Sequence, residues 1–165
     1  MGRVIDMYDL EPDKLSLADK ESLFLETLKG YLAKDQNLVT NLANMSAVIH
    51  AFYPELNWVG FYLYDDKGLY LGPFQGMPAC TSIHIGKGVC GTSAKNVLPL
   101  LVPDTSKFPG HIVCDVASKS ELVIPVVHNS RLVGVLDLDS PELDHFQKTD
   151  LVLFTKAVNL LVDIL

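Results

Sequence analysis

The chain has 165 residues, of which 48% are hydrophobic, and a formal net charge of −7. This length is typical of one domain, and the apolar fraction excludes a disordered chain. The negative charge, without any cluster of lysine or arginine, argues against binding to nucleic acid. No apolar run reaches the ~20 residues that a membrane span needs, and the acidic start lacks an apolar signal core. We therefore expect a cytoplasmic protein.

The first third of the chain shows the apolar periodicity of helices. We expect an N-terminal extension over residues 1–15, followed by two helices within residues 16–53. Ser16 and Asp19 stand at the spacing of a helix cap before the first helix. Pro54 follows the apolar stripe of the second helix and marks its end.

The middle of the chain changes to the alternating pattern of strands. We expect one hairpin at 57–72, a short strand, a short helix and another strand at 80–104, a long irregular connection at 105–121, and a second hairpin at 121–140. The apolar face of residues 144–165 predicts a closing helix. These elements predict a single α+β domain, with a central antiparallel sheet and pocket loops at 57–141, helices packed on one face and a ligand pocket on the other.

Two acids interrupt the apolar run at the end of the second hairpin. Side chains alternate along a strand, so Asp137 and Asp139 should share a face with Val133 and Val135, opposite Leu132. Neighbouring carboxylates raise one another's pKa and are costly to bury. The strand end is therefore either fully solvated, or a cation or a proton lies between the two acids.

Three cysteines fall in the irregular middle of the chain, at Cys80, Cys90 and Cys114. An odd number at wide intervals favours free thiols or redox chemistry over a structural disulfide framework. Cys90 lies near the start of the short helix, where the helix dipole favours a thiolate. Cys114 follows His111 by three residues, and a protonated imidazole there would lower the pKa of the thiol. Local physics does not choose between the two.

A zinc site is a further possibility, because Cys80 is followed by His84 and His111 is followed by Cys114. Sulfur and imidazole are the usual zinc ligands. Neither interval is the paired-cysteine spacing typical of zinc sites, however. We therefore expect no metal site.

Four blocks follow one another between Asn57 and Pro141: NWVGFYLY, LGPFQGMPACTSIHIGKGVCGTSA, VPDTSKFPGHIVCDVASKSELVIPV and GVLDLDSP. In this order they closely resemble the free methionine-(R)-sulfoxide reductases, which are built on a GAF domain. The resemblance implies an oxidoreductase that reduces the R epimer of free methionine sulfoxide. It further implies that Cys114 is the nucleophile, Cys80 the resolving cysteine and Cys90 a secondary thiol. The substrate-binding positions of the family match Trp58, Glu121, Asp137 and Asp139.

The chemistry implied by the resemblance needs only side chains and an external thiol. A thiolate attacks the sulfoxide sulfur, and a carboxyl group that can share a proton assists the departing oxygen. The resulting sulfenic acid condenses with a second thiol to a disulfide, which thioredoxin reduces. No metal or organic cofactor is required, and the resemblance favours a homodimer.

The groups of the substrate also find partners in this pattern. Its ammonium group would supply the cation for Asp137 and Asp139, and Trp58 would form an apolar wall for the methyl group, although a core role for this side chain is nearly as plausible. Backbone N–H groups near residues 88–91 would bind the carboxylate.

The register of the second hairpin decides whether Glu121 joins this site. With a regular two-residue turn at Asn129 and Ser130, Glu121 would face Leu138 and point away from the aspartates. A shift by one residue places Glu121 opposite Asp139, and we predict this shifted register. Two rival hypotheses are a GAF module that only senses a small ligand and a thiol redox sensor without a substrate.

Overall fold

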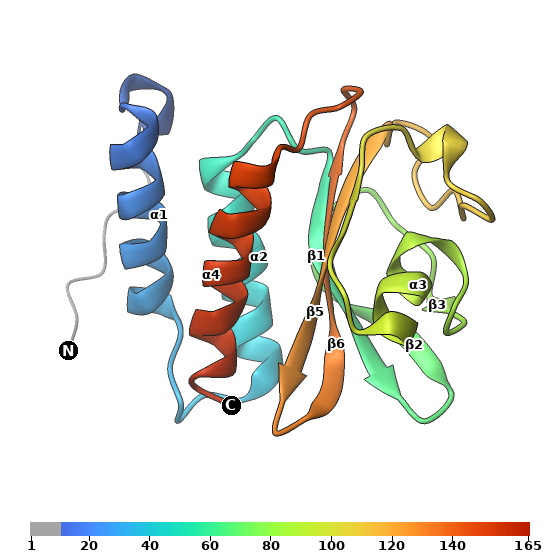
Figure 1. Ribbon diagram of the computed structural model, residues 1–165. Coiled ribbons are helices and arrows are strands. Elements are labelled where there is room, and N and C mark those ends of the chain that lie inside the picture. The colour runs from blue at the N-terminus through green and yellow to red at the C-terminus, as the bar shows by residue number, and fades with distance from the viewer. Residues whose placement is uncertain (1–10) are drawn as a thin grey trace.

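The computed structural model describes residues 11–165, so residues 1–10 of the expected extension lie outside the described part (Figure 1). Its centre is a six-stranded antiparallel sheet with the strand order β3-β2-β1-β6-β5-β4. The strands are β1 (Trp58–Asp65), β2 (Gly68–Gly76), β3 (Ser82–Ile83), β4 (Leu100–Val102), β5 (Ser120–His128) and β6 (Arg131–Ser140). Both predicted hairpins are present, as β1–β2 and β5–β6.

The helices are α1 (Leu17–Tyr31), α2 (Leu38–Phe52), α3 (Gly88–Asn96) and α4 (Lys148–Val162), with the 3₁₀ turns η2 (Pro12–Lys14) and η3 (Thr105–Lys107). Local capping defines where the long helices begin. The Ser16 side chain accepts the N–H of Asp19 before α1, and Asp150 accepts the N–H of Gln147 at 2.7 Å before α4. The longest helices have 15 residues, and none in the described part combines the length and the apolar character needed to span a bilayer.

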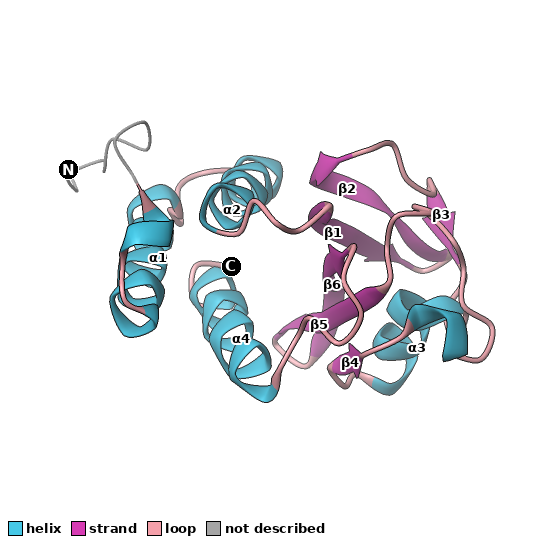
Figure 2. Ribbon diagram, turned by 90° about the horizontal axis from the view of Figure 1, so that it is seen from above, coloured by secondary structure: helices cyan, strands magenta, loops and turns pink. Residues whose placement is uncertain are grey.

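The molecule is layered. Helices α2 and α4 pack on one face of the sheet, and α1 lies outside them (Figures 1 and 2). The opposite face carries α3 and the loops that hold the cysteines (Figure 2). This arrangement confirms the predicted α+β fold, with the short helix α3 as the cover of the second face.

An apolar core lies between the sheet and the three long helices. Phe24 of α1 contacts the rings of Phe52, Tyr53 and Phe154, with ring centroids 5.5 to 5.9 Å apart. Strands β1, β5 and β6 contribute alternate residues, such as Phe61, to the same core. Full burial of such a side chain contributes about 1.5–3 kcal/mol, so this core holds the sheet face rigid under the candidate site.

The β5–β6 hairpin confirms the predicted register. Its two-residue turn has positive φ values of 50° at Asn129 and 61° at Ser130, as the tight hairpin turn requires. A bulge then shifts the pairing between Val126 and Val127, so that Glu121 lies opposite Asp139. The shift therefore comes from a bulge after a regular two-residue turn.

The same bulge makes the predicted faces of Leu132 and Val133 wrong. Leu132 packs with the apolar side chains on the α3 side of the sheet, whereas Val133 packs with the core under the long helices. The extra residue in β6 reverses the faces between the turn and the bulge. Beyond it, Val135, Asp137 and Asp139 keep the predicted common face.

Candidate active site

Three acids meet on the sheet face that α3 covers. Glu121 comes from β5, and Asp137 and Asp139 come from the neighbouring strand β6. Their exposed fractions are only 6%, 6% and 8%. The solvated strand end considered above is therefore wrong, because the acids lie inside the protein.

Burial determines the protonation of these acids. Desolvation, and then the charge of neighbouring acids, raises the pKa of Glu121, Asp137 and Asp139 well above their ordinary values. The site therefore favours the neutral form of these carboxyl groups, which can donate hydrogen bonds. Oδ1 of Asp137 has no hydrogen-bond partner among residues 11–165. Such an atom is suited to a ligand that supplies a donor or a positive charge.

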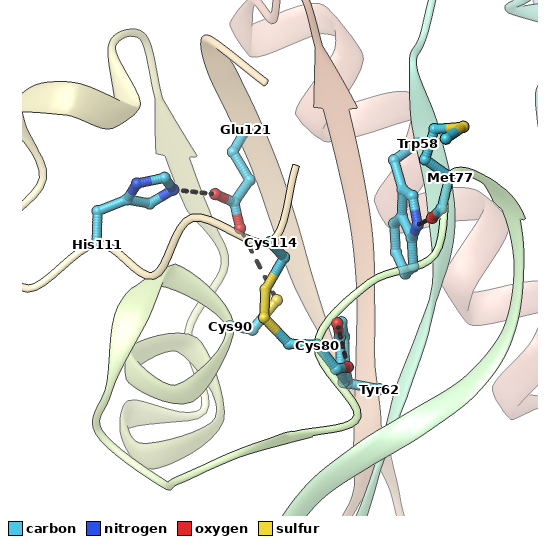
Figure 3. The surroundings of a disulfide bond; sticks show 8 residues. All are labelled: Trp58, Tyr62, Met77, Cys80, Cys90, His111, Cys114 and Glu121. Atoms are coloured by element: carbon cyan, nitrogen blue, oxygen red, sulfur yellow. Dashed lines mark hydrogen bonds and ion pairs between the residues drawn. A yellow bond between two sulfur atoms is a disulfide. The ribbon is translucent and has the colours of Figure 1, made fainter. Parts of the chain in front are cut away.

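A disulfide joins Cys80 and Cys114 beside the acids (Figure 3). It links the segment after β2 to the loop between η3 and β5, with 5.3 Å between the Cα atoms. Cys114 lines the cavity that contains the three acids, and Cys80 is absent from its lining. The structure therefore places Cys114 on the wall of the cavity that holds the acids, whereas Cys80 lies outside that wall.

Cys90 lies in the first turn of α3, as predicted, but it is not an activated thiol. The residue is 3% exposed, and its Sγ lies 3.8 Å from Oε1 of Glu121, to which the thiol donates (Figure 3). Desolvation, followed by the charges of Asp137 and Glu121, raises the pKa of this thiol well above its ordinary value. The expectation that the helix dipole favours a thiolate at Cys90 is wrong, because burial outweighs the helix dipole.

His111 does not activate Cys114 in the predicted way. The segment around both residues is not helical, and Nε2 of His111 instead lies 3.7 Å from Oε2 of Glu121 (Figure 3). Burial lowers the pKa of His111, so the imidazole is neutral at neutral pH. The contact therefore places a neutral imidazole beside Glu121.

The cavity is small in this disulfide-bonded state. Water centres can occupy about 20 Å³ of it, and one water needs about 10–15 Å³. Its lining comes from α3, the Cys114 loop, β5 and β6: Ile83, Lys87, Gly88, Val89, Cys90, His111, Ile112, Cys114, Asp115, Ser118, Glu121, Asp137 and Asp139. The oxidised state thus has room for about one water beside the acids, and a larger ligand requires the cavity to open.

Trp58 belongs to the aromatic packing beside this cavity. The residue is 1% exposed, and its ring stacks on Tyr62 and Phe74 with centroids 5.8 and 5.2 Å away. Its Nε1 donates to the carbonyl of Met77 at 3.1 Å (Figure 3). Trp58 shares the sheet face of Asp139, its partner across β1 and β6, but it does not line the cavity in this state.

Two residues that the sequence reasoning missed hold the cysteine segments in place. The hydroxyl of Tyr62 donates to the carbonyl of Cys80 at 2.9 Å. The side-chain amide of Asn57 donates to Asp115 and to Ser118, both at 3.0 Å, and so fixes the loop after Cys114. Alternation from Trp58 could have placed Tyr62 on the site face, whereas nothing local predicts the contacts of Asn57.

The zinc ligand set considered above is not assembled. Cys80 and Cys114 are joined to each other, and His84 is exposed. A different group does offer metal-binding atoms close together, namely Cys90, Glu121 and Asp137. Chemically, the site combines a disulfide with a cluster of buried acids.

Comparisons with known proteins agree with this arrangement. The model of the GAF domain family matches residues 32–163. The free methionine-R-sulfoxide reductase of Escherichia coli is 43% identical over 119 residues, 72% of each chain, and that of Saccharomyces cerevisiae is 40% identical over 154 residues, 87% of this chain and 86% of the relative. The structure of the Neisseria meningitidis free methionine-R-sulfoxide reductase with its substrate superposes with a TM-score of 0.84 at 37% identity, covering 91% of this chain and 92% of that chain. The chain therefore belongs to the GAF domain family, in the group that includes the free methionine-R-sulfoxide reductases.

Proposed function

We propose that this protein reduces free methionine-(R)-sulfoxide to methionine. The observation that carries the proposal is the Cys80–Cys114 disulfide, whose Cys114 lines a cavity with three buried acids. The relatives from Escherichia coli and Saccharomyces cerevisiae, 43% and 40% identical, are named for this activity. The Neisseria meningitidis enzyme was solved with its substrate.

The reaction begins with Cys114. Its thiolate attacks the sulfoxide sulfur, the sulfur–oxygen bond breaks, and the oxygen passes to Cys114 as a sulfenic acid while methionine leaves. Neutral carboxyl groups assist, because a protonated acid can donate a hydrogen bond or a proton to the departing oxygen. The raised pKa values of Glu121, Asp137 and Asp139 support this role.

The thiol of Cys80 then condenses with the sulfenic acid, which releases water and forms the disulfide. An external dithiol protein, which we take to be thioredoxin, reduces this bond and returns both thiols. In this scheme the described structure corresponds to the oxidised product. Cys90 is a secondary thiol, because its burial keeps it from thiol–disulfide exchange until the loop that carries Cys114 moves. A cytoplasmic location would provide the reductant.

Substrate recognition uses both charges of the free amino acid. The ammonium group binds the acid cluster and lowers the pKa of the acid it contacts, so that this acid ionises while another keeps its proton. The carboxylate binds the N–H groups of Gly88 to Cys90, which begin α3 and have no partner within a helix. Trp58 forms the apolar wall for the methyl group, on the face it shares with Asp139.

The test is an NADPH-coupled thioredoxin assay with separated R and S epimers of free methionine sulfoxide. We expect turnover of the R epimer alone. Cys114→Ser should abolish reduction, whereas Cys80→Ser should still release about one methionine per protein in a single turnover without sustaining the coupled cycle. Equal loss of the R epimer with the parent protein and with Cys114→Ser would exclude this nucleophile. Binding without turnover would indicate a ligand-sensing module instead.

The proposal also includes a homodimer, which rests on resemblance to the family. Light scattering of the purified protein tests it, since a monomer and a dimer differ twofold in mass. A monomeric mass would remove the dimer and leave the proposed chemistry unchanged.

A further inference from the structure

Three buried residues of the cavity offer ligand atoms for a metal ion. The thiol sulfur of Cys90 and one carboxylate oxygen each of Glu121 and Asp137 all lie within 4.8 Å of one another. All three residues are buried, and all three line the cavity. Thiolate sulfur and carboxylate oxygen are both ligands that a borderline divalent cation such as Zn²⁺ accepts.

The distance between the Cys90 sulfur and the Glu121 oxygen is close to that between zinc ligands. Tetrahedral zinc with bonds of about 2.3 Å to sulfur and about 2.0 Å to oxygen places the two ligand atoms about 3.5 Å apart. Cys90 Sγ and Glu121 Oε1 are 3.8 Å apart. These two atoms are therefore slightly farther apart than zinc ligands, and the three side chains must contract around the ion.

An unpartnered atom gives independent support. Oδ1 of Asp137 is buried, lies in a residue that is 6% exposed and lines the cavity, and has no hydrogen-bond partner among residues 11–165. A buried oxygen without a hydrogen-bond partner has lost its contacts with water and has gained no other hydrogen bond in exchange. A cation at the centre of the three donors would satisfy it.

We propose that Zn²⁺ binds to Cys90, Glu121 and Asp137, with water at the fourth position. Binding replaces the proton of the Cys90 thiol and those of the two carboxyl groups, which pass to the solvent. Three protein ligands with one open position are the pattern of accessible zinc sites. The ion is neither oxidised nor reduced, and no electron donor is needed.

The consequence is inhibition, which rests on the proposed function. Glu121 and Asp137, which hold the ion, belong to the acid cluster that is proposed to bind the ammonium group of the substrate. Zinc should therefore compete with free methionine-(R)-sulfoxide, raising its apparent KM and leaving kcat unchanged at saturating substrate. Binding of the metal itself does not depend on the reaction.

Cobalt offers a direct probe of the ligands. In the oxidised protein Cys90 is the only free thiol of the three cysteines, so a cobalt–thiolate charge-transfer band reports on this residue alone. We expect one equivalent of Co²⁺ to produce the band and one equivalent of Zn²⁺ to remove it. Cys90→Ser should abolish it, and Asp137→Asn should weaken zinc binding in calorimetry by at least the 10–100-fold that loss of an outer-shell partner costs.

The matched control is Asp66→Asn, which removes an exposed acid in the turn between β1 and β2 and should leave zinc affinity unchanged. The proposal is overturned if no thiolate band forms, or if the band and the affinity survive in Asp137→Asn. Zinc that binds through the thiolate but does not raise the apparent KM would overturn the competition. An inactive protein that still shows the band would remove the proposed function and keep the metal site.

Discussion

Replacing Asp137 by asparagine should make the stability of the oxidised protein less dependent on pH. Burial, and then the charge of Glu121, raises the pKa of Asp137 well above its ordinary value, so the native state keeps this proton. The unfolded chain loses the same proton near the ordinary value of about 3.9. Above that pH the unfolded state binds fewer protons than the native state, so the free energy of unfolding falls as the pH rises.

The size of the effect follows from the proton count. A difference of one bound proton changes the free energy of unfolding by about 1.4 kcal/mol per pH unit. At pH values between the unfolded and the native pKa, the Asp137 carboxyl should therefore lower the stability as the pH rises, whereas asparagine, which has no proton to lose, should not. The dependence ends only where the pH rises through the native pKa of the acid.

Urea unfolding at three pH values, with the disulfide intact, measures the two slopes. All other titratable groups are common to both proteins, so the difference between the slopes reports on the buried acid cluster around Asp137. Asp66→Asn, which changes an exposed acid, should leave the slope of the parent unchanged. Parallel slopes for the parent protein and Asp137→Asn would show that the native carboxyl is already ionised, and would refute the reasoning.

Three further outcomes test the turn, the packing and the buried thiol. Ser130→Gly should raise the free energy of unfolding by roughly 0.5–1 kcal/mol in urea titrations, because the φ of 61° at Ser130 favours glycine. An unchanged or lower free energy of unfolding would contradict the positive-φ turn. Gly60→Ala should lower it by about 1–3 kcal/mol, because the added methyl overlaps Phe74 and the Trp58 ring, and an unaffected midpoint would refute that close approach. Iodoacetamide should label Cys90 slowly in the folded oxidised protein and rapidly in urea, since burial withholds the thiol and raises its pKa. Mass spectrometry measures the labelling, and equally fast labelling of the folded protein would contradict this burial.

Local signals predicted most of the fold. Caps such as Ser16, apolar periodicity and turn residues act over a few positions, so the sequence alone indicates where helices and hairpins lie. The common face of Asp137 and Asp139 follows from the same short-range alternation. The expectation of a thiolate at Cys90 also rests on a local argument, and it is wrong.

The sequence by itself therefore determined the elements, the acid pair and the resemblance of the cysteine pattern to a known family. Only the tertiary structure decided how these parts are used. A bulge in β6 brought Glu121 opposite Asp139, and contacts between distant segments paired Cys114 with Cys80. Packing of α3 against the sheet buried Cys90 and raised the pKa of its thiol. Pairing, register and protonation depend on neighbours brought together from distant parts of the chain, and their combined desolvation cannot be read from any local stretch.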